Sequence, residues 1–157
     1  MAGESDHKYM ALALEQAKKC VPTSTAYCVG AVLVVPSAAG DQILATGYSR
    51  ELPGNTHAEQ CCFEKYAGDG AAPARAIPAS AVLYTTMEPC VERLSGNLPC
   101  VDRILQYGVQ TVKVGVLEPN TFVKDNDSLK RLQAHGVRYE QVPGFADKCL
   151  EVARRGH

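Results

Sequence analysis

The sequence predicts an α/β protein, a three-layer α/β/α sandwich built around a five-stranded mixed sheet. Its 157 residues are the length of one domain, so we expect residues 1–157 to form a single unit. Short apolar runs rich in β-branched residues alternate with segments of helical periodicity. Only a turn separates the first two apolar runs, whereas helical segments separate the later ones. This order predicts a hairpin followed by parallel strands.

The first half of the chain is expected to contain a helix, two strands and a second helix. Apolar residues recur at helical spacing over residues 6–20. Residues 29–35 form a continuous valine-rich run, which is typical of a strand buried on both faces. A turn that begins at Pro36 leads into a second strand over residues 42–48. After a loop that contains Pro-Gly, a helix is predicted over residues 57–67.

The second half alternates strands with helices. The strands are expected over residues 81–86, 111–117 and 137–141. The helices are expected over residues 99–107, 127–135 and 144–154. Gly108 and Gly136 follow two of these helices, and glycine is the residue that most commonly ends a helix.

Charge and composition exclude several classes of function. With 16 Lys and Arg against 17 Asp and Glu, the net charge is −1, so no overall basic field attracts a nucleic-acid backbone. No apolar run approaches the roughly eighteen residues that span a membrane, and the first residues lack the features of a signal peptide. Seven cysteines in such a chain favour free thiols or metal ligands over disulfides. We therefore expect a cytoplasmic protein that binds neither nucleic acid nor membranes.

Two clusters of chemically versatile residues occur where helices begin. The first contains His57 and, two residues later, Glu59; the second contains Cys90 and, after nine further residues, Cys100. One imidazole and two thiolates suit Zn²⁺ with a fourth position left open, as in catalytic zinc sites. A carboxylate in the first turn of the helix can transfer protons between a zinc-activated water and a leaving group. The pattern predicts His57, Cys90 and Cys100 as zinc ligands and Glu59 as the catalytic acid–base.

Structural explanations exist for the same residues. Thr56 and Glu59 fit a capping box, in which the carboxylate only satisfies backbone donors at the start of the helix. Cys90 and Cys100 could instead pack as small buried apolar residues. The remaining cysteines are expected to be structural. Cys20, Cys28 and Cys149 have no ligand-like neighbours, and the adjacent Cys61 and Cys62 point to different faces of their helix, which favours core packing.

The His-x-Glu motif followed by two Pro-Cys pairs resembles the zinc-dependent nucleobase deaminases of the cytidine deaminase superfamily. The usual members have two residues between the cysteines, and the nine residues here resemble the deaminase of riboflavin biosynthesis. The run Arg-Leu-Ser-Gly-Asn at residues 93–97 resembles the stand-alone fungal form of that enzyme. Three further runs resemble the strands of that family and the loop that reaches its substrate: residues 29–34, 85–90 and 114–120.

The resemblance implies a hydrolase with Zn²⁺ as cofactor that acts on a phosphorylated pyrimidine. The implied reaction removes the exocyclic amine of 2,5-diamino-6-ribitylamino-4(3H)-pyrimidinone 5'-phosphate, and the implied assembly is a homodimer. A chain of 157 residues has no room for the reductase that is fused to the bacterial enzymes. The alternatives are a deaminase of another free base or nucleoside, a deaminase of tRNA or other nucleic acid, and a non-catalytic zinc module.

The substrate contacts carry over from the family only in part. Arg50 stands where the bacterial pattern has a substrate-facing His, and it is either a second phosphate ligand or a surface residue. The charge, small polar groups and flexible backbone of residues 93–97 could hold a phosphate or polyol, although a solvated turn has the same composition. The expected substrate-binding residues are Arg50, Asn55, Arg93, Ser95, Asn97 and Asn120.

Overall fold

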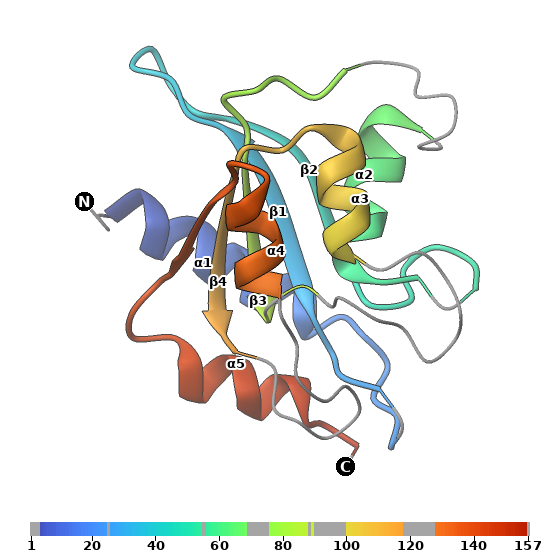
Figure 1. Cartoon of the computed structure of the whole chain (residues 1–157). Coiled ribbons are helices and arrows are strands. Elements are labelled where there is room, and N and C mark those ends of the chain that lie inside the picture. Colours follow the sequence, from blue (N-terminus) through green and yellow to red (C-terminus); the bar gives the residue numbers. More distant parts are fainter. Residues whose placement is uncertain are drawn as a thin grey trace.

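The computed structural model describes residues 4–24, 26–54, 56–68, 76–87, 89, 100–117 and 128–156. Within these residues, five strands form one sheet and five helices lie against it (Figure 1). The strands are β1 (Gly30–Val35), β2 (Gln42–Tyr48), β3 (Val82–Met87), β4 (Thr111–Val116) and β5 (Arg138–Gln141). The helices are α1 (Glu4–Ala17), α2 (Ala58–Ala67), α3 (Cys100–Tyr107), α4 (Ser128–Ala134) and α5 (Ala146–Ala153).

The sheet is mixed, as predicted. Its strand order is β2-β1-β3-β4-β5, which makes β3 the middle strand. β1 pairs antiparallel with both β2 and β3, whereas β3, β4 and β5 are parallel to one another. The expected hairpin of β1 and β2 is therefore confirmed, and its register shifts between Leu33 and Val34. Parallel pairing of β3 and β4 requires a crossover, and α3 lies within it.

Every predicted element is present, with ends that differ by up to three residues. The first helix ends at Ala17 rather than at residue 20 because the Cys20 N–H bonds to the Ala17 carbonyl, a tighter turn than α-helix. The last helix begins at Ala146 rather than at residue 144. Gly144 has a φ of 90°, which no α-helical residue adopts.

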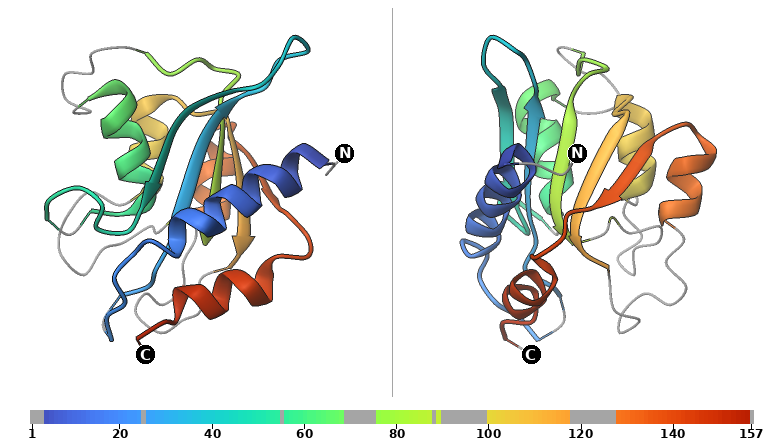
Figure 2. Two further views of the ribbon diagram at one scale, coloured as in Figure 1. Left: turned by 180° about the vertical axis from the view of Figure 1, so that it is seen from behind. Right: turned by 90° about the vertical axis from the view of Figure 1, so that its left-hand side faces the viewer.

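The helices cover the two faces of the sheet unequally (Figure 2). α1 and α5 lie on one face, and α2, α3 and α4 lie on the other, which confirms the three-layer sandwich. As expected for a strand between two layers, β1 is buried on both faces over most of its length. Among the described residues, no helix combines the length and the apolar character that crossing a membrane requires.

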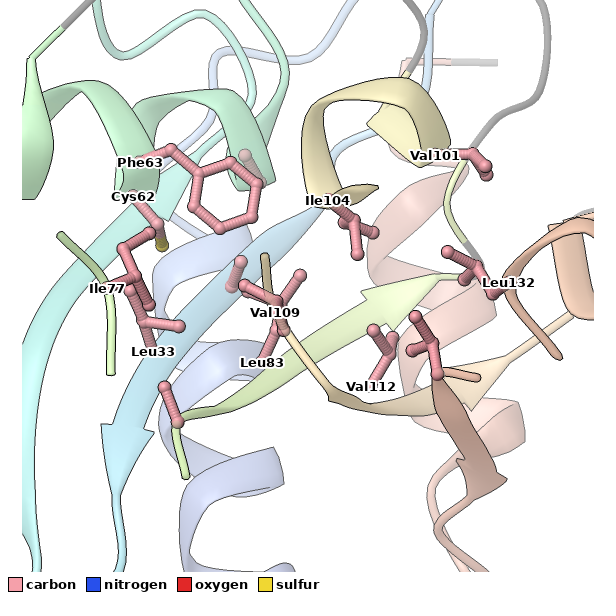
Figure 3. Close-up of a cluster of buried hydrophobic side chains, with 14 of the residues drawn as sticks. Leu33, Cys62, Phe63, Ile77, Leu83, Val101, Ile104, Val109, Val112 and Leu132 are labelled. Atoms are coloured by element: carbon pink, nitrogen blue, oxygen red, sulfur yellow. The ribbon is translucent and has the colours of Figure 1, made fainter. Parts of the chain in front are cut away.

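The larger hydrophobic core lies under α2, α3 and α4 (Figure 3). Phe63, Ile104 and Leu132 come from these three helices, and Leu33 and Val112 come from the sheet beneath them. All five side chains are fully buried. The apolar residues of α2, α3 and α4 thus meet those of the sheet in one core, which fixes these three helices on the sheet.

The opposite face of the sheet contains a buried polar cluster. The Asp6 carboxylate of α1 is 2.9 Å from Nζ of Lys113 on β4, and it accepts a 2.6 Å hydrogen bond from the Tyr84 hydroxyl on β3. Burial, together with the hydrogen bond to Asp6, raises the pKa of Tyr84, so this hydroxyl stays protonated as a donor. Glu140 is also near the cation, at 3.5 Å. The cluster links the first turn of α1 to two strands of the sheet.

Replacing Lys113 with methionine should destabilise the protein, because it leaves the buried Asp6 carboxylate without its cation. Loss of one partner of a buried ion pair costs about 3 kcal/mol, and for a protein of this size that lowers the melting temperature by roughly 6–12 °C. Lys18→Met is the matched control. Lys18 follows the end of α1 and forms an exposed ion pair with Glu15 of that helix. Equal melting temperatures for the two variants, measured by circular dichroism, would contradict a stabilising role for the cluster.

Candidate active site

Two neighbouring helices carry the candidate site, and their packing brings its residues together. The Phe63 ring of α2 stacks on the Tyr107 ring of α3, with a centroid distance of 4.8 Å. The Tyr107 hydroxyl donates a 2.7 Å hydrogen bond to the carbonyl of Gly68, just past the end of α2. Because the C-terminal ends of the two helices are joined in this way and their first turns also meet, α2 and α3 run side by side in the same direction (Figure 1).

A glycine on β2 sets how closely α2 approaches the sheet. A Cβ atom at Gly47 would overlap the carbonyl oxygen of Ala58 and would lie 3.0 Å from the Cβ of Cys61. Only glycine therefore permits this approach of strand and helix. The backbone of the first turn of α2, which carries the candidate catalytic residues, is held directly against the sheet.

The start of α2 differs from the capping-box alternative. His57, not Thr56, occupies the N-cap position, and the Gln60 side chain accepts a 3.4 Å hydrogen bond from the His57 N–H. The Thr56 hydroxyl instead donates to the carbonyl of Leu52 at 2.9 Å. The helix therefore begins one residue later than a Thr56–Glu59 capping box requires, and Gln60 takes the place that this alternative gave to Glu59.

His57, Glu59 and Cys100 meet at the point where α2 and α3 begin. His57 Nδ1 is 3.1 Å from Cys100 Sγ, and this sulfur is 3.4 Å from Glu59 Oε2. One possible ligand atom from each residue lies within 4.8 Å of the other two. Glu59 and Cys100 are 3 % and 1 % exposed, whereas His57 is partly exposed. The structure thus brings together residues that are 43 positions apart in the chain.

This donor set fits zinc. Imidazole nitrogen and thiolate sulfur are the ligands that Zn²⁺ takes most often, and catalytic zinc sites leave one position open. Cys100 is the first residue of α3, where the positive end of the helix dipole favours an anionic sulfur. A buried carboxylate and two soft ligands in one cluster suit metal-assisted hydrolysis with a general acid–base beside the metal.

Glu59 is also held by a residue that the sequence analysis did not single out. The Thr85 hydroxyl of β3 lies 2.9 Å from Glu59 Oε1 and 3.0 Å from the carbonyl oxygen of Met87. Thr85 is fully buried. The signal for it was the pair of threonines at positions 85 and 86 in a buried strand. Thr85 is two positions from Leu83 and hence on the face that α2 covers.

The expected substrate-binding residues are described only in part. Arg50 has a φ of 63°, and its guanidinium donates to the Val21 carbonyl at 2.6 Å and to Cys20 Sγ at 3.0 Å. This contact ties the segment after β2 to the connection between α1 and β1. A role for Arg50 in phosphate binding stays a prediction. The other residues expected to hold zinc or substrate lie outside the described residues: Asn55, Cys90, Arg93, Ser95, Asn97 and Asn120.

The five cysteines that were expected to be structural are all buried: Cys20, Cys28, Cys61, Cys62 and Cys149. Burial, reinforced by the neighbouring Cys28 thiol, raises the pKa of Cys20 to about 12. Burial likewise raises the pKa of Cys149 to about 11 and that of Cys62 well above its usual value. Thiols of this kind are neutral at physiological pH. The prediction of core packing for these residues is confirmed.

Comparison with known proteins places this geometry in a family. Residues 3–116 match the family described as the cytidine and deoxycytidylate deaminase zinc-binding region. A diaminohydroxyphosphoribosylamino-pyrimidine deaminase from Schizosaccharomyces pombe is 45 % identical over 150 residues, which are 96 % of this chain. The chain spans about a third of the length of that relative, 35 %.

Solved structures show the same similarity. The Rib2 deaminase of Aspergillus oryzae, a C-terminal deletion mutant, superposes with a TM-score of 0.84 at 41 % identity, covering 96 % of this chain and 91 % of the other. A further structure of that deaminase, in complex with DARIPP, superposes with a TM-score of 0.82 at 40 % identity, with the same two coverages. The resemblance to fungal deaminases that residues 93–97 suggested is therefore supported along nearly the whole chain.

The family match includes both helices that carry the cluster and the middle strand that holds Glu59. With its His57, Glu59 and Cys100 gathered at 3.1 and 3.4 Å, the chain belongs to the cytidine and deoxycytidylate deaminase zinc-binding family.

Proposed function

We propose that this protein is a zinc-dependent deaminase of a phosphorylated diaminopyrimidine in riboflavin biosynthesis. The observation that carries the proposal is the cluster of His57, Glu59 and Cys100, because it combines metal ligands with a buried carboxylate. The substrate class is supported by the similarity to the S. pombe deaminase and to the A. oryzae deaminase in complex with DARIPP. The substrate is 2,5-diamino-6-ribitylamino-4(3H)-pyrimidinone 5'-phosphate.

Three side chains of this chain hold the zinc ion. His57 and Cys100 already face one another, and Cys90 is the third ligand on the basis of its sequence motif. Pro89, which precedes Cys90, is buried and follows the last residue of β3 by two positions. When bound, zinc lowers the pKa of a coordinated water to about 7, so hydroxide is available at neutral pH.

Glu59 transfers the protons of the reaction. It accepts a proton from the attacking water and delivers it to the ring nitrogen of the substrate. It then moves the second water proton to the exocyclic amine, which leaves as ammonia while the ring carbon becomes a carbonyl. The Oε2 atom is suited to this role because it faces Cys100, whereas Oε1 is turned toward Thr85. Glu59 needs no direct bond to the metal in this scheme.

Residues outside the described part of the chain complete the substrate site. Arg93, Ser95 and Asn97 bind the phosphorylated arm, and Asn55 and Asn120 contact the remainder of the substrate. A cation and several small polar groups before α3 are suited to a phosphate, because the amino end of a helix attracts anions. Assembly as a homodimer and a cytoplasmic location accompany this proposal as predictions.

An ammonia-release assay across related compounds tests the proposed substrate. Zinc-loaded protein should act on the phosphorylated ribityl compound and should lose roughly 10- to 150-fold in kcat/KM on the dephosphorylated one. This loss corresponds to about 1.5–3 kcal/mol for a hydrogen bond to a charged group. The same assay is run with three further compounds: the ribosyl counterpart of the substrate, cytidine and deoxycytidine monophosphate. Equal turnover with and without the phosphate, or faster turnover of cytidine, would overturn the assignment.

Glu59→Gln should nearly abolish deamination and leave the fold and the zinc content unchanged. General acid–base catalysis contributes about 10²–10⁴-fold for each proton transfer, and the amide can perform neither transfer. Ammonia release under single-turnover conditions measures the loss, and elemental analysis measures the zinc. Gln60→Ala is the matched control, since Gln60 is the next residue on the helix and its side chain accepts a hydrogen bond from the backbone N–H of His57 in the helix cap. A Glu59→Gln protein that retains zinc and a tenth of the parental rate would exclude this role.

A further inference from the structure

Thr85 is a fully buried hydroxyl that the reaction scheme leaves without a role. Its Oγ1 atom lies 2.9 Å from Glu59 Oε1 and 3.0 Å from the Met87 carbonyl oxygen. A hydroxyl has one proton to donate, and an ionised carboxylate is a stronger acceptor than a backbone carbonyl. Thr85 therefore donates to Glu59, and its bond to this carboxylate joins the middle strand of the sheet to the first turn of α2.

The position of this hydroxyl is unusually well fixed. Thr85 lies opposite Ala31 on β1 and Val114 on β4, so its backbone is flanked by a paired strand on both sides. Threonine is β-branched, and its χ1 angle is restricted when the side chain is buried. The sheet thus holds Oγ1 in place independently of the helices that carry the metal ligands.

Glu59 needs such a fixed partner. Its side chain has three rotatable bonds, and its carboxylate is almost completely buried, so an unpartnered oxygen would be costly. The hydrogen bond at Oε1 determines how the carboxylate plane is rotated, and with this orientation Oε2 lies 3.4 Å from Cys100 Sγ. One oxygen is anchored to the sheet, and the other faces the metal-binding cluster.

We propose that Thr85 is a positioning residue for the reaction: its hydroxyl orients the Glu59 carboxylate so that Oε2 faces the reacting atoms. This inference rests on the proposed function, because it assigns Thr85 a part in the proton transfers of Glu59. The same bond would be only structural if Glu59 had no catalytic role.

The adjacent threonine provides a matched comparison. Thr86 is as buried as Thr85, but its hydroxyl accepts a 3.1 Å hydrogen bond from the backbone N–H of Gly30. Successive residues of a strand point to opposite faces, so this side chain lies on the other side of the sheet from Glu59. Removing either hydroxyl leaves one buried polar partner unsatisfied, but only removal at Thr85 affects the carboxylate.

The decisive comparison is between Thr85→Ser and Thr85→Ala, which differ by one oxygen atom, with Thr85→Val as the variant that preserves volume. Thr85→Ala and Thr85→Val should lower kcat about 10- to 100-fold, as misplacement of a catalytic group does. KM should change less than about threefold in all three, because the hydroxyl contacts Glu59 and not the substrate. Thr85→Ser should keep kcat within about threefold of the parent. Thr86→Val should lower the melting temperature and leave kcat unchanged.

Combining each change with Glu59→Gln separates positioning from a general loss of structure. If Thr85 acts through Glu59, Thr85→Ala should lower the residual single-turnover rate of Glu59→Gln by less than about twofold. Zinc content should remain near one equivalent in every variant. Equal kcat values for Thr85→Ala and Thr85→Ser, or full additivity with Glu59→Gln, would overturn the proposal. Absence of deamination by the parent would instead overturn the proposed function, so the two failures are distinguishable.

Discussion

The 3.1 Å approach of His57 Nδ1 to Cys100 Sγ depends on how two helices are held against one face of the sheet. Gly47 lets the first turn of α2 lie directly on β2, and the stacked rings of Phe63 and Tyr107 hold α3 beside α2. Both helices begin at the cluster, so the positive ends of their dipoles lie beside the Cys100 sulfur and the Glu59 carboxylate. A shift of either helix along the other by one turn, about 5.4 Å, would separate the ligands beyond the reach of a single metal ion.

The two faces of the sheet have different parts in this arrangement. The face under α2, α3 and α4 carries the larger hydrophobic core and, at one end of it, the cluster that is proposed to bind zinc. The face under α1 contains the ion pair of Asp6 and Lys113 with the Tyr84 hydroxyl, which links helix and strands on the side away from the metal ligands. β3 contributes to both, since Tyr84 faces one side and Thr85 the other. The middle strand therefore contributes both to the buried ion-pair cluster and to the contact that holds Glu59.

Much of the fold could be predicted because the spacing of apolar residues and the positions of turn-forming residues are local properties of the chain. The valine-rich run of β1, the hairpin and the alternating later elements follow from such patterns, as does the placement of His57 and Cys100 at the starts of helices. The ends of α1 and α5 were less accurate, since a tightened last turn and a glycine with positive φ decide them. A Thr56–Glu59 capping box also fitted the sequence, whereas the structure places His57 at the N-cap with Gln60 in the capping role.

Interactions between distant segments could not be predicted from one sequence. Thr85 and Glu59 are 26 positions apart, and Asp6 and Lys113 are 107 apart, so no spacing rule relates them. The contact of Arg50 with Val21 is similar: the sequence left Arg50 as either a phosphate ligand or a surface residue, and no spacing rule predicted the hydrogen bond from its guanidinium to the Val21 carbonyl. Pairs of this kind follow from strand order and helix packing, which the alternation of elements limits but does not determine.

The proposed reaction depends on coordination of zinc by His57, Cys90 and Cys100, with one position left open. X-ray absorption at the zinc K-edge, recorded on the purified protein without substrate, measures that coordination directly. The spectrum should contain two sulfur atoms at about 2.3 Å and two lighter atoms at about 2.0–2.1 Å, one of them an imidazole nitrogen. Cys100→Ser should lose one of the two sulfur contributions or the metal itself. A parental spectrum with a single sulfur, or with four, would contradict the account.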